Sequence, residues 1–137
     1  MAFSGSKEDR DAIRDLYGSY SDASSCGDVE RFLACFAEDG QWNTHIFSRS
    51  GKAELLAQWE ELWIAFERVG FLSEIGSIEV DGNTASCRCV AREIIRLKSG
   101  GLYKLIGQYT DQLVRVDGNW LFRKRDYDPI AEEAPGQ

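Results

Sequence analysis

The sequence predicts an α+β fold, in which three N-terminal helices pack on a strongly curved, mostly antiparallel sheet. Apolar residues recur at helical spacing in the first half of the 137-residue chain and alternate with polar residues, as in strands, in the second half. Two Asp-Gly pairs, Asp81-Gly82 and Asp117-Gly118, separate β-rich runs, which is a strong hairpin signal. A chain of this length fits one domain, residues 1–137, with one core.

The first helix is predicted to begin after Ser6, because the run Ser-Lys-Glu-Asp places a capping hydroxyl three residues before an acidic side chain. It should end between residues 24 and 27, and Asp28 can cap a second, short helix. The apolar stripe of the first helix consists of Ile13, Leu16, Tyr17 and Tyr20.

The next segment is predicted to form a turn at residues 37–40, a strand at 41–47 and a break at 48–51. A third helix is predicted at 52–68, with Gly70 as its left-handed cap. The inward residues of this strand and helix are Trp42, Thr44, Ile46, Leu55, Trp59, Leu62, Trp63 and Phe66.

From residue 71 onward, alternation predicts strands at 71–80, at 84–97, from 102 to the turn at 117–118, and from there to 127. Two prolines and an acidic pair predict a flexible, solvated tail at 128–137, which leaves a core of about 6–127. The strand that starts at 102 has one face of mostly large groups that needs a cover: Tyr103, Leu105, Gly107, Tyr109, Asp111 and Leu113.

Small residues face these large groups from the neighbouring strand. Ala85, Cys87, Cys89 and Ala91 share one face of the strand 84–97. They either let a helix approach the sheet closely or leave a cone-shaped pocket between sheet and helices, and both interpretations remain open at this point.

Composition excludes several classes of function. A net charge of −7 and a pI near 4.7 argue against nucleic acid or an anionic membrane as a partner. The four cysteines form no C-x-x-C pair and only His45 could join them, so no metal site is expected. The sequence shows no signal peptide or membrane span, so a cytoplasmic location is expected.

Three phrases of the sequence resemble the SnoaL-like family of the nuclear transport factor 2-like superfamily. They are DRDAIRDLYGSYSDASSCGDVERFLACFAEDGQW, IEVDGNTASC and GQYTDQLVRVDGNWLFRKRDY, and the resemblance spans residues 9–127. It implies a cone-shaped fold with a central pocket. The enzymes closest in pattern are cofactor-free lyases: scytalone dehydratase, bile acid 7α-dehydratase and lindane dehydrochlorinase.

In these lyases, the resemblance implies an Asp–His dyad assisted by a Tyr or Lys on the first helix and an Arg on the last strand. The assisting positions correspond to Tyr20 and Arg125 in this chain. The dyad aspartate corresponds to Ser25 and the dyad histidine to Gly70, so both dyad positions depart from the family pattern. The proton acceptor is therefore unassigned.

Four side chains are candidates for catalysis: Tyr20, Arg125, Asp22 and His45. Tyr20 is either a hydrogen-bond donor to substrate or an ordinary core tyrosine. Helical geometry directs Asp22 toward solvent, and strict strand alternation turns His45 away from Trp42.

The orientation of Arg125 depends on the hairpin that precedes it. A three-residue connection at 117–119 would pair Arg125 with Asp111 on the inner face, where Asp111 could hold the guanidinium in place. A two-residue turn at 117–118 would place Trp120 and Phe122 inward and Arg125 outward unless a bulge intervenes. The family position favours the inward orientation.

Two functions are expected from these features. The first is a cofactor-independent lyase or isomerase (elimination, dehydration or aldol-type C–C cleavage) that acts on a small hydrophobic cyclic or aromatic substrate. The second is a non-catalytic module that binds a small molecule or assembles with another subunit, and a homo-oligomer (dimer or trimer) is expected in either case. The predicted substrate-binding residues are Trp42, Thr44, Trp59, Leu62, Phe66, Tyr109, Ser25 and Asp111.

Overall fold

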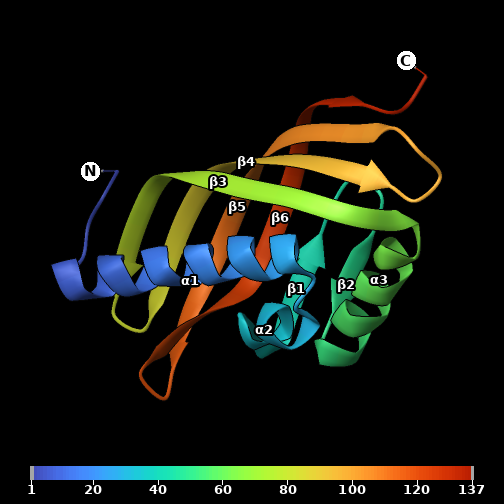
Figure 1. Ribbon diagram of the computed structural model, residues 1–137. Helices are drawn as coiled ribbons and strands as arrows, with labels where there is room; N and C mark the ends of the chain where they lie inside the picture. The colour runs from blue at the N-terminus through green and yellow to red at the C-terminus, as the bar shows by residue number, and fades with distance from the viewer. Residues whose placement is uncertain (1, 137) are drawn as a thin grey trace.

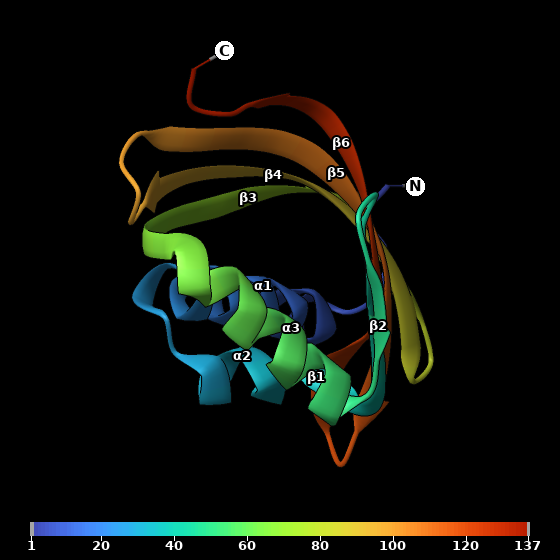
Figure 2. The same cartoon turned by 90° about the vertical axis from the view of Figure 1, so that its right-hand side faces the viewer.

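The computed structural model describes residues 2–136, which form three helices and one six-stranded sheet. The strand order is β2-β1-β6-β5-β4-β3, antiparallel throughout except for β1 and β6, which run parallel. The sheet curls around the helices, which lie within its concave side (Figures 1 and 2). The α+β prediction with a curved sheet is confirmed. The elements are α1 (Lys7–Cys26), α2 (Val29–Ala34), β1 (Phe36–Asn43), β2 (Ser48–Ser50), α3 (Lys52–Ala65), β3 (Phe66–Asp81), β4 (Thr84–Leu97), β5 (Leu102–Val116) and β6 (Asn119–Glu133).

The first two helices have the ends that the sequence predicts. The Ser6 side chain accepts a hydrogen bond from the Asp9 backbone N–H at 3.0 Å, and Gly27 closes α1 with φ 71° in the left-handed region. Asp28 caps α2 by accepting from the Arg31 N–H at 3.1 Å. The predicted stripe of α1 is buried. Within residues 2–136, no helix combines the length and the apolar run needed to cross a bilayer.

The segment between α2 and β4 differs from the prediction. Residues 37–40 lie within β1 and not in a turn, and a second strand, β2, lies in the expected break at 48–51. Helix α3 ends at Ala65, and Gly70 lies in mid-strand instead of capping a helix. Residues 66–69 pair with the end of β4, and this pairing outweighs the weak helical preference of the segment.

The predicted solvated tail is wrong for residues 128–133, which continue β6 alongside β5. Pro129 is accommodated because it lies opposite Gly107, at an irregularity where Ile130 is the extra residue of the ladder. Gly107 has a second role, since an added Cβ there would lie 2.2 Å from the Tyr127 ring. The missing side chain gives Tyr127 the space to lie across β5.

The hairpin of β5 and β6 has the two-residue turn of one prediction and the inward Arg125 of the other. Its turn has two residues, Asp117 at φ 51° and Gly118 at φ 81°, and Trp120 and Phe122 are buried as a two-residue turn requires. A bulge then adds Arg123 between the pairs formed by Phe122 and Lys124. Because the bulge shifts the register by one residue, Arg125 pairs with Asp111 and turns inward.

Arg125 and Asp111 form an ion pair that is wholly buried in the core. Arg125 Nε lies 2.9 Å from Asp111 Oδ1, and Nη2 lies 3.0 Å from Oδ2. Tyr17 donates its hydroxyl to the same carboxylate. Aromatic rings surround the guanidinium, with its Cζ 3.8 Å from the Tyr109 ring centroid and 4.4 Å from that of Tyr20.

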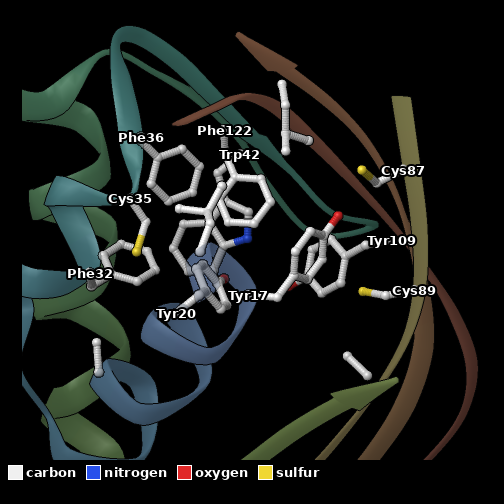
Figure 3. Packing of buried hydrophobic residues seen from close by; sticks show 14 of the residues in the cluster. Tyr17, Tyr20, Phe32, Cys35, Phe36, Trp42, Cys87, Cys89, Tyr109 and Phe122 are labelled. Carbon is white, nitrogen blue, oxygen red and sulfur yellow. The ribbon is translucent and has the colours of Figure 1, made fainter. Parts of the chain in front are cut away.

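The remaining core is built from aromatic rings of both the helices and the strands, together with small residues of the sheet (Figure 3). Tyr20 packs against Phe32, Phe71 and Phe122 with centroid distances of 5.3–5.7 Å. Cys87 and Cys89 are buried on β4 as free thiols, facing the interior as the sequence predicts. The space beneath α1 is therefore packed with rings, which selects close packing over a pocket in that part of the fold.

We predict that Gly107→Ala destabilises the protein by roughly 1–3 kcal/mol, because the new methyl group overlaps the Tyr127 ring. Gly70→Ala is the matched control, since a Cβ at this strand glycine meets only the Ile94 carbonyl oxygen at 3.7 Å. Urea denaturation measures both free energies of unfolding. Equal stabilities of the two variants would show that Tyr127 does not need the space.

Replacing one partner of the buried ion pair should lower the free energy of unfolding far more than replacing both partners. Asp111→Leu and Arg125→Met each leave one partner unneutralised in the core and should cost roughly 3–5 kcal/mol, whereas the double variant should lose less than either single one. A double-mutant cycle of unfolding free energies measures this coupling. Additive losses would contradict it.

Candidate functional site

A cavity of about 230 Å³ lies beside the packed core, at the other end of the sheet's concave face. The loop between β1 and β2, the C-terminal end of α3 and strands β4, β5 and β6 enclose it. Its lining residues are Trp42, Thr44, His45, Ile46, Phe47, Leu62, Phe66, Glu93, Ile95, Tyr103, Leu105, Tyr109 and Tyr127. The structure thus contains both the close packing and the pocket that the sequence left as alternatives.

A larger depression, of about 620 Å³, runs between α1, α2 and the turn of β5 and β6. It is an open surface groove, and its charged lining residues, Asp15, Arg31 and Asp117, are all solvent-exposed. Exposed charges of this kind keep ordinary solvation. The smaller, more enclosed and largely apolar cavity is therefore the better candidate for a ligand site.

Two polar groups in the cavity have no hydrogen-bond partner within residues 2–136. The first is the Tyr127 hydroxyl, which is buried without a hydrogen bond. The Glu93 carboxyl has neither a hydrogen bond nor an ion pair, although it is only partly exposed. Polar groups without partners are costly in an apolar hollow, so this cavity is a candidate ligand site.

Glu93 is a candidate functional residue that was not predicted from the sequence. It lies on β4 between Phe71 of β3 and Leu105 of β5, and it points into the cavity. Burial away from water raises the pKa of the Glu93 carboxyl to about 7, although the positive charge of Arg125 opposes part of that rise. The signal was present in the alternation, because Glu93 extends the inward face that begins at Ala85 and is its only charged member.

The mouth of the cavity carries a second group of titratable side chains. His45 Nε2 lies 3.7 Å from a carboxylate oxygen of Glu132, and the Tyr103 hydroxyl donates to the other oxygen. Burial, followed by the contact with Glu132, raises the pKa of Tyr103 to about 12. Tyr103 therefore stays protonated and acts as a donor.

The loop at residues 44–47 explains the position of His45. The Thr44 hydroxyl accepts hydrogen bonds from the backbone N–H groups of Ile46 at 3.1 Å and Phe47 at 3.2 Å. This turn ends the alternation of β1 at Asn43, so His45 lines the cavity together with Trp42 and Thr44 instead of facing away.

Most of the predicted pocket residues do line this cavity, namely Trp42, Thr44, Leu62, Phe66 and Tyr109. The other three lie elsewhere in the fold. Trp59 packs between Phe32 and Trp63 in the helical layer, and Asp111 is held by Arg125. The Ser25 hydroxyl bonds the backbone of Phe71, accepting from its N–H at 3.0 Å.

Of the four predicted catalytic residues, only His45 lines the cavity. Tyr20 and Arg125 lie inside the protein but behind the Tyr109 ring, and burial raises the pKa of the Tyr20 phenol. The Arg125 Nη1 is buried without a partner. Asp22 is exposed at the end of α1, where it forms an ion pair with Arg31.

The structure also places the two positions that the resemblance assigned to the dyad. Gly70 is exposed on the outer face of β3, so a side chain there would not reach the interior. Its neighbour Phe71 turns inward beside Ser25. The two interior positions therefore carry a hydroxyl engaged with backbone and a phenyl ring, and neither can accept a proton from a substrate.

The comparison of this chain with known proteins agrees with its architecture. A protein assigned as a scytalone dehydratase from Novosphingobium aromaticivorans DSM 12444 is 25% identical, with a TM-score of 0.86 over 92% of this chain and 87% of that chain. A protein assigned as an aromatic ring hydroxylase from Novosphingobium aromaticivorans is 20% identical, with a TM-score of 0.89 over 95% of both chains.

A hexachlorocyclohexane dehydrochlorinase from Novosphingobium barchaimii LL02 is 18% identical, with a TM-score of 0.83 over 95% of this chain and 92% of that chain. At such identities the likeness shows the fold. No protein with a curated description matches the sequence. The sequence profile of the SnoaL-like domain matches residues 6–126, which is most of the chain, and this protein therefore belongs to the SnoaL-like domain family.

Proposed function

We propose that this protein is a cofactor-independent lyase or isomerase that binds a small hydrophobic cyclic or aromatic substrate in the cavity and uses Glu93 as its proton acceptor. The observation that carries the proposal is the unpartnered Glu93 carboxyl inside an apolar hollow. A structural neighbour assigned as a dehydratase and another named as a dehydrochlorinase support the class of reaction.

Glu93 has the properties that general base catalysis needs. A base is most effective when its pKa lies near the working pH, and Glu93 meets this condition with a pKa of about 7. The position that the resemblance assigns to the family's base is Gly70, which has no side chain and lies exposed on the outer face of β3. Glu93 thus supplies from β4 the proton acceptor that the dyad positions lack.

Two donors in the same cavity can stabilise the negative charge that proton removal creates. The Tyr127 O–H and the Trp42 N–H both line the cavity. The Tyr127 hydroxyl has no hydrogen bond within residues 2–136, and the Trp42 N–H lies beside the Tyr109 hydroxyl. Burial raises the pKa of the Tyr127 phenol, so it remains a donor at neutral pH. Donors held in a water-poor site stabilise a developing oxyanion without reorganising.

The chemical step is a proton transfer coupled to bond rearrangement. Glu93 takes a proton from a carbon of the substrate, and the electron pair of that C–H bond either expels a leaving group or moves toward an oxygen that Tyr127 and Trp42 hold. A retro-aldol cleavage uses the same base on a hydroxyl proton. The cavity surrounds this chemistry with aromatic rings, which exclude water and strengthen each remaining interaction.

The Glu93→Gln variant should lose about 10²–10⁴-fold in rate, because the amide cannot accept the proton. A suitable probe is 5-nitrobenzisoxazole, a small bicycle whose base-promoted ring opening removes a C–H proton, breaks an N–O bond and releases a coloured phenolate. The rate of the native protein should rise with pH through about 7, as Glu93 ionises.

Glu132→Gln is the matched control, since Glu132 is an exposed carboxyl at the mouth and should leave the rate of this probe unchanged. An equal loss of rate in both variants would mean that negative charge near the cavity mouth, and not a general base, accelerates the reaction. Binding of ring compounds with no acceleration of the probe or of any carbon acid would favour the non-catalytic binding module instead.

The pH dependence of the free energy of unfolding should reveal the raised pKa of Glu93 without any substrate. A carboxyl whose pKa is raised on folding favours the folded state fully below its unfolded pKa, near 4.5, and this contribution is lost as pH rises through about 7. Glu93→Gln should therefore gain stability relative to the native protein between about pH 4 and pH 8, by on the order of 3 kcal/mol. Denaturant unfolding at a series of pH values measures this difference, and a constant difference would contradict the raised pKa.

A further inference from the structure

The charge distribution around the cavity is one-sided. Of the residues that line it, none is Lys or Arg, and Glu93 is the carboxylate among them. A second carboxylate, Glu132, lies at the mouth on His45 and Tyr103. The aromatic lining residues are Trp42, Phe47, Phe66, Tyr103, Tyr109 and Tyr127. Their ring faces carry negative electrostatic potential, which attracts cations.

The buried cation nearest to this lining already has a carboxylate of its own. Arg125 stacks on Tyr109 and is held by both oxygens of Asp111, and its attraction offsets only part of the rise that burial causes in the pKa of Glu93. Glu93 has no cation of its own within residues 2–136. A carboxylate in an aromatic enclosure without a counter-ion is most stable when a bound molecule provides one.

We propose that the cavity selects small ring compounds that carry a protonated amine, with Glu93 as the counter-ion and the surrounding rings as a cation–π enclosure. The inference uses the same site as the proposed function but does not depend on its chemistry. An ammonium group held against the Glu93 carboxylate would occupy the position of the substrate proton, so such amines act as competitive ligands for the site.

The size of the cavity limits the ring system. A cavity of about 150 Å³ holds benzene, so about 230 Å³ accepts one ring with a short substituent. Carboxylic acids of the same size are excluded, because they would bring a second negative charge beside Glu93 with no cation to balance it. The amine, the alcohol and the acid of one carbon skeleton therefore distinguish the proposal from simple hydrophobic binding.

The test is calorimetric binding of benzylamine, benzyl alcohol and benzoate to the native protein at about pH 8, where Glu93 is ionised and benzylamine is protonated. Benzylamine should bind at least about tenfold more tightly than benzyl alcohol, and benzoate should bind most weakly. The preference for the amine should vanish in Glu93→Gln and persist in Glu79→Gln, which removes an exposed carboxyl of β3 outside the cavity lining. Circular dichroism and binding of benzyl alcohol verify that the variants are folded.

Lowering the pH should also weaken amine binding as Glu93 gains its proton, but other groups contribute to that profile. The titratable and charged groups that face Glu93 are Arg125, Tyr20, Tyr103, Tyr109, Tyr127, His45 and Glu132. Because these groups surround Glu93, the Glu93→Gln variant is the decisive comparison.

Equal affinities for benzylamine and benzyl alcohol would overturn the inference, as would an amine preference that survives in Glu93→Gln. Neither result would affect the proposed function, which is measured by the loss of rate in Glu93→Gln on 5-nitrobenzisoxazole. Conversely, an amine preference without any catalysis would support the inference and contradict the proposed function.

Discussion

The fold depends on a charged pair that is fully removed from water. Arg125 and Asp111 join the last two strands, while Tyr17 and Tyr20 bring helix α1 onto the same two charges. Such a pair is tolerated only when geometry is good and neighbouring groups complete its hydrogen bonds. The Tyr17 hydroxyl and the Cys89 sulfur complete these hydrogen bonds except at Arg125 Nη1, so the pair ties α1 to β4, β5 and β6.

This arrangement divides the interior of the cone into two regions. Beneath α1, rings and small residues pack around the ion pair and leave no room for a ligand (Figure 3). Beyond Tyr109, the inward face of β4 changes from small residues to Glu93, and a hollow opens. The rigid region fixes the strands, and the hollow gains walls of defined shape, as a preorganised site requires.

The fold could be predicted from the sequence because local signals were consistent with one another. The caps of α1 and α2, the Asp-Gly turns and the alternation of β4 each specify an element with little help from the rest of the chain. The parallel pairing of β1 with β6 and the extension of β6 beyond Tyr127 could not be predicted, since strand pairing is a long-range property.

The candidate site was only half predictable for a similar reason. Trp42, Thr44, Leu62, Phe66 and Tyr109 follow from periodicity and family position. Arg125 points inward because of the bulge at Arg123. The sequence of a two-residue turn does not predict an extra residue further along the strand. Glu93 was detectable by alternation, but its significance depends on its having no ion pair within residues 2–136, which only the packed structure reveals.

Tyr109 has one further consequence. The Tyr109 ring separates the buried Arg125–Asp111 pair, whose guanidinium Cζ lies 3.8 Å from the ring centroid, from the cavity that contains the Glu93 carboxyl. A relative with a small residue at this position would remove this separation and present the guanidinium to whatever enters. The cavity of such a relative would then favour acidic ligands over basic ones, so the side chain at this one position would determine the charge of the ligand.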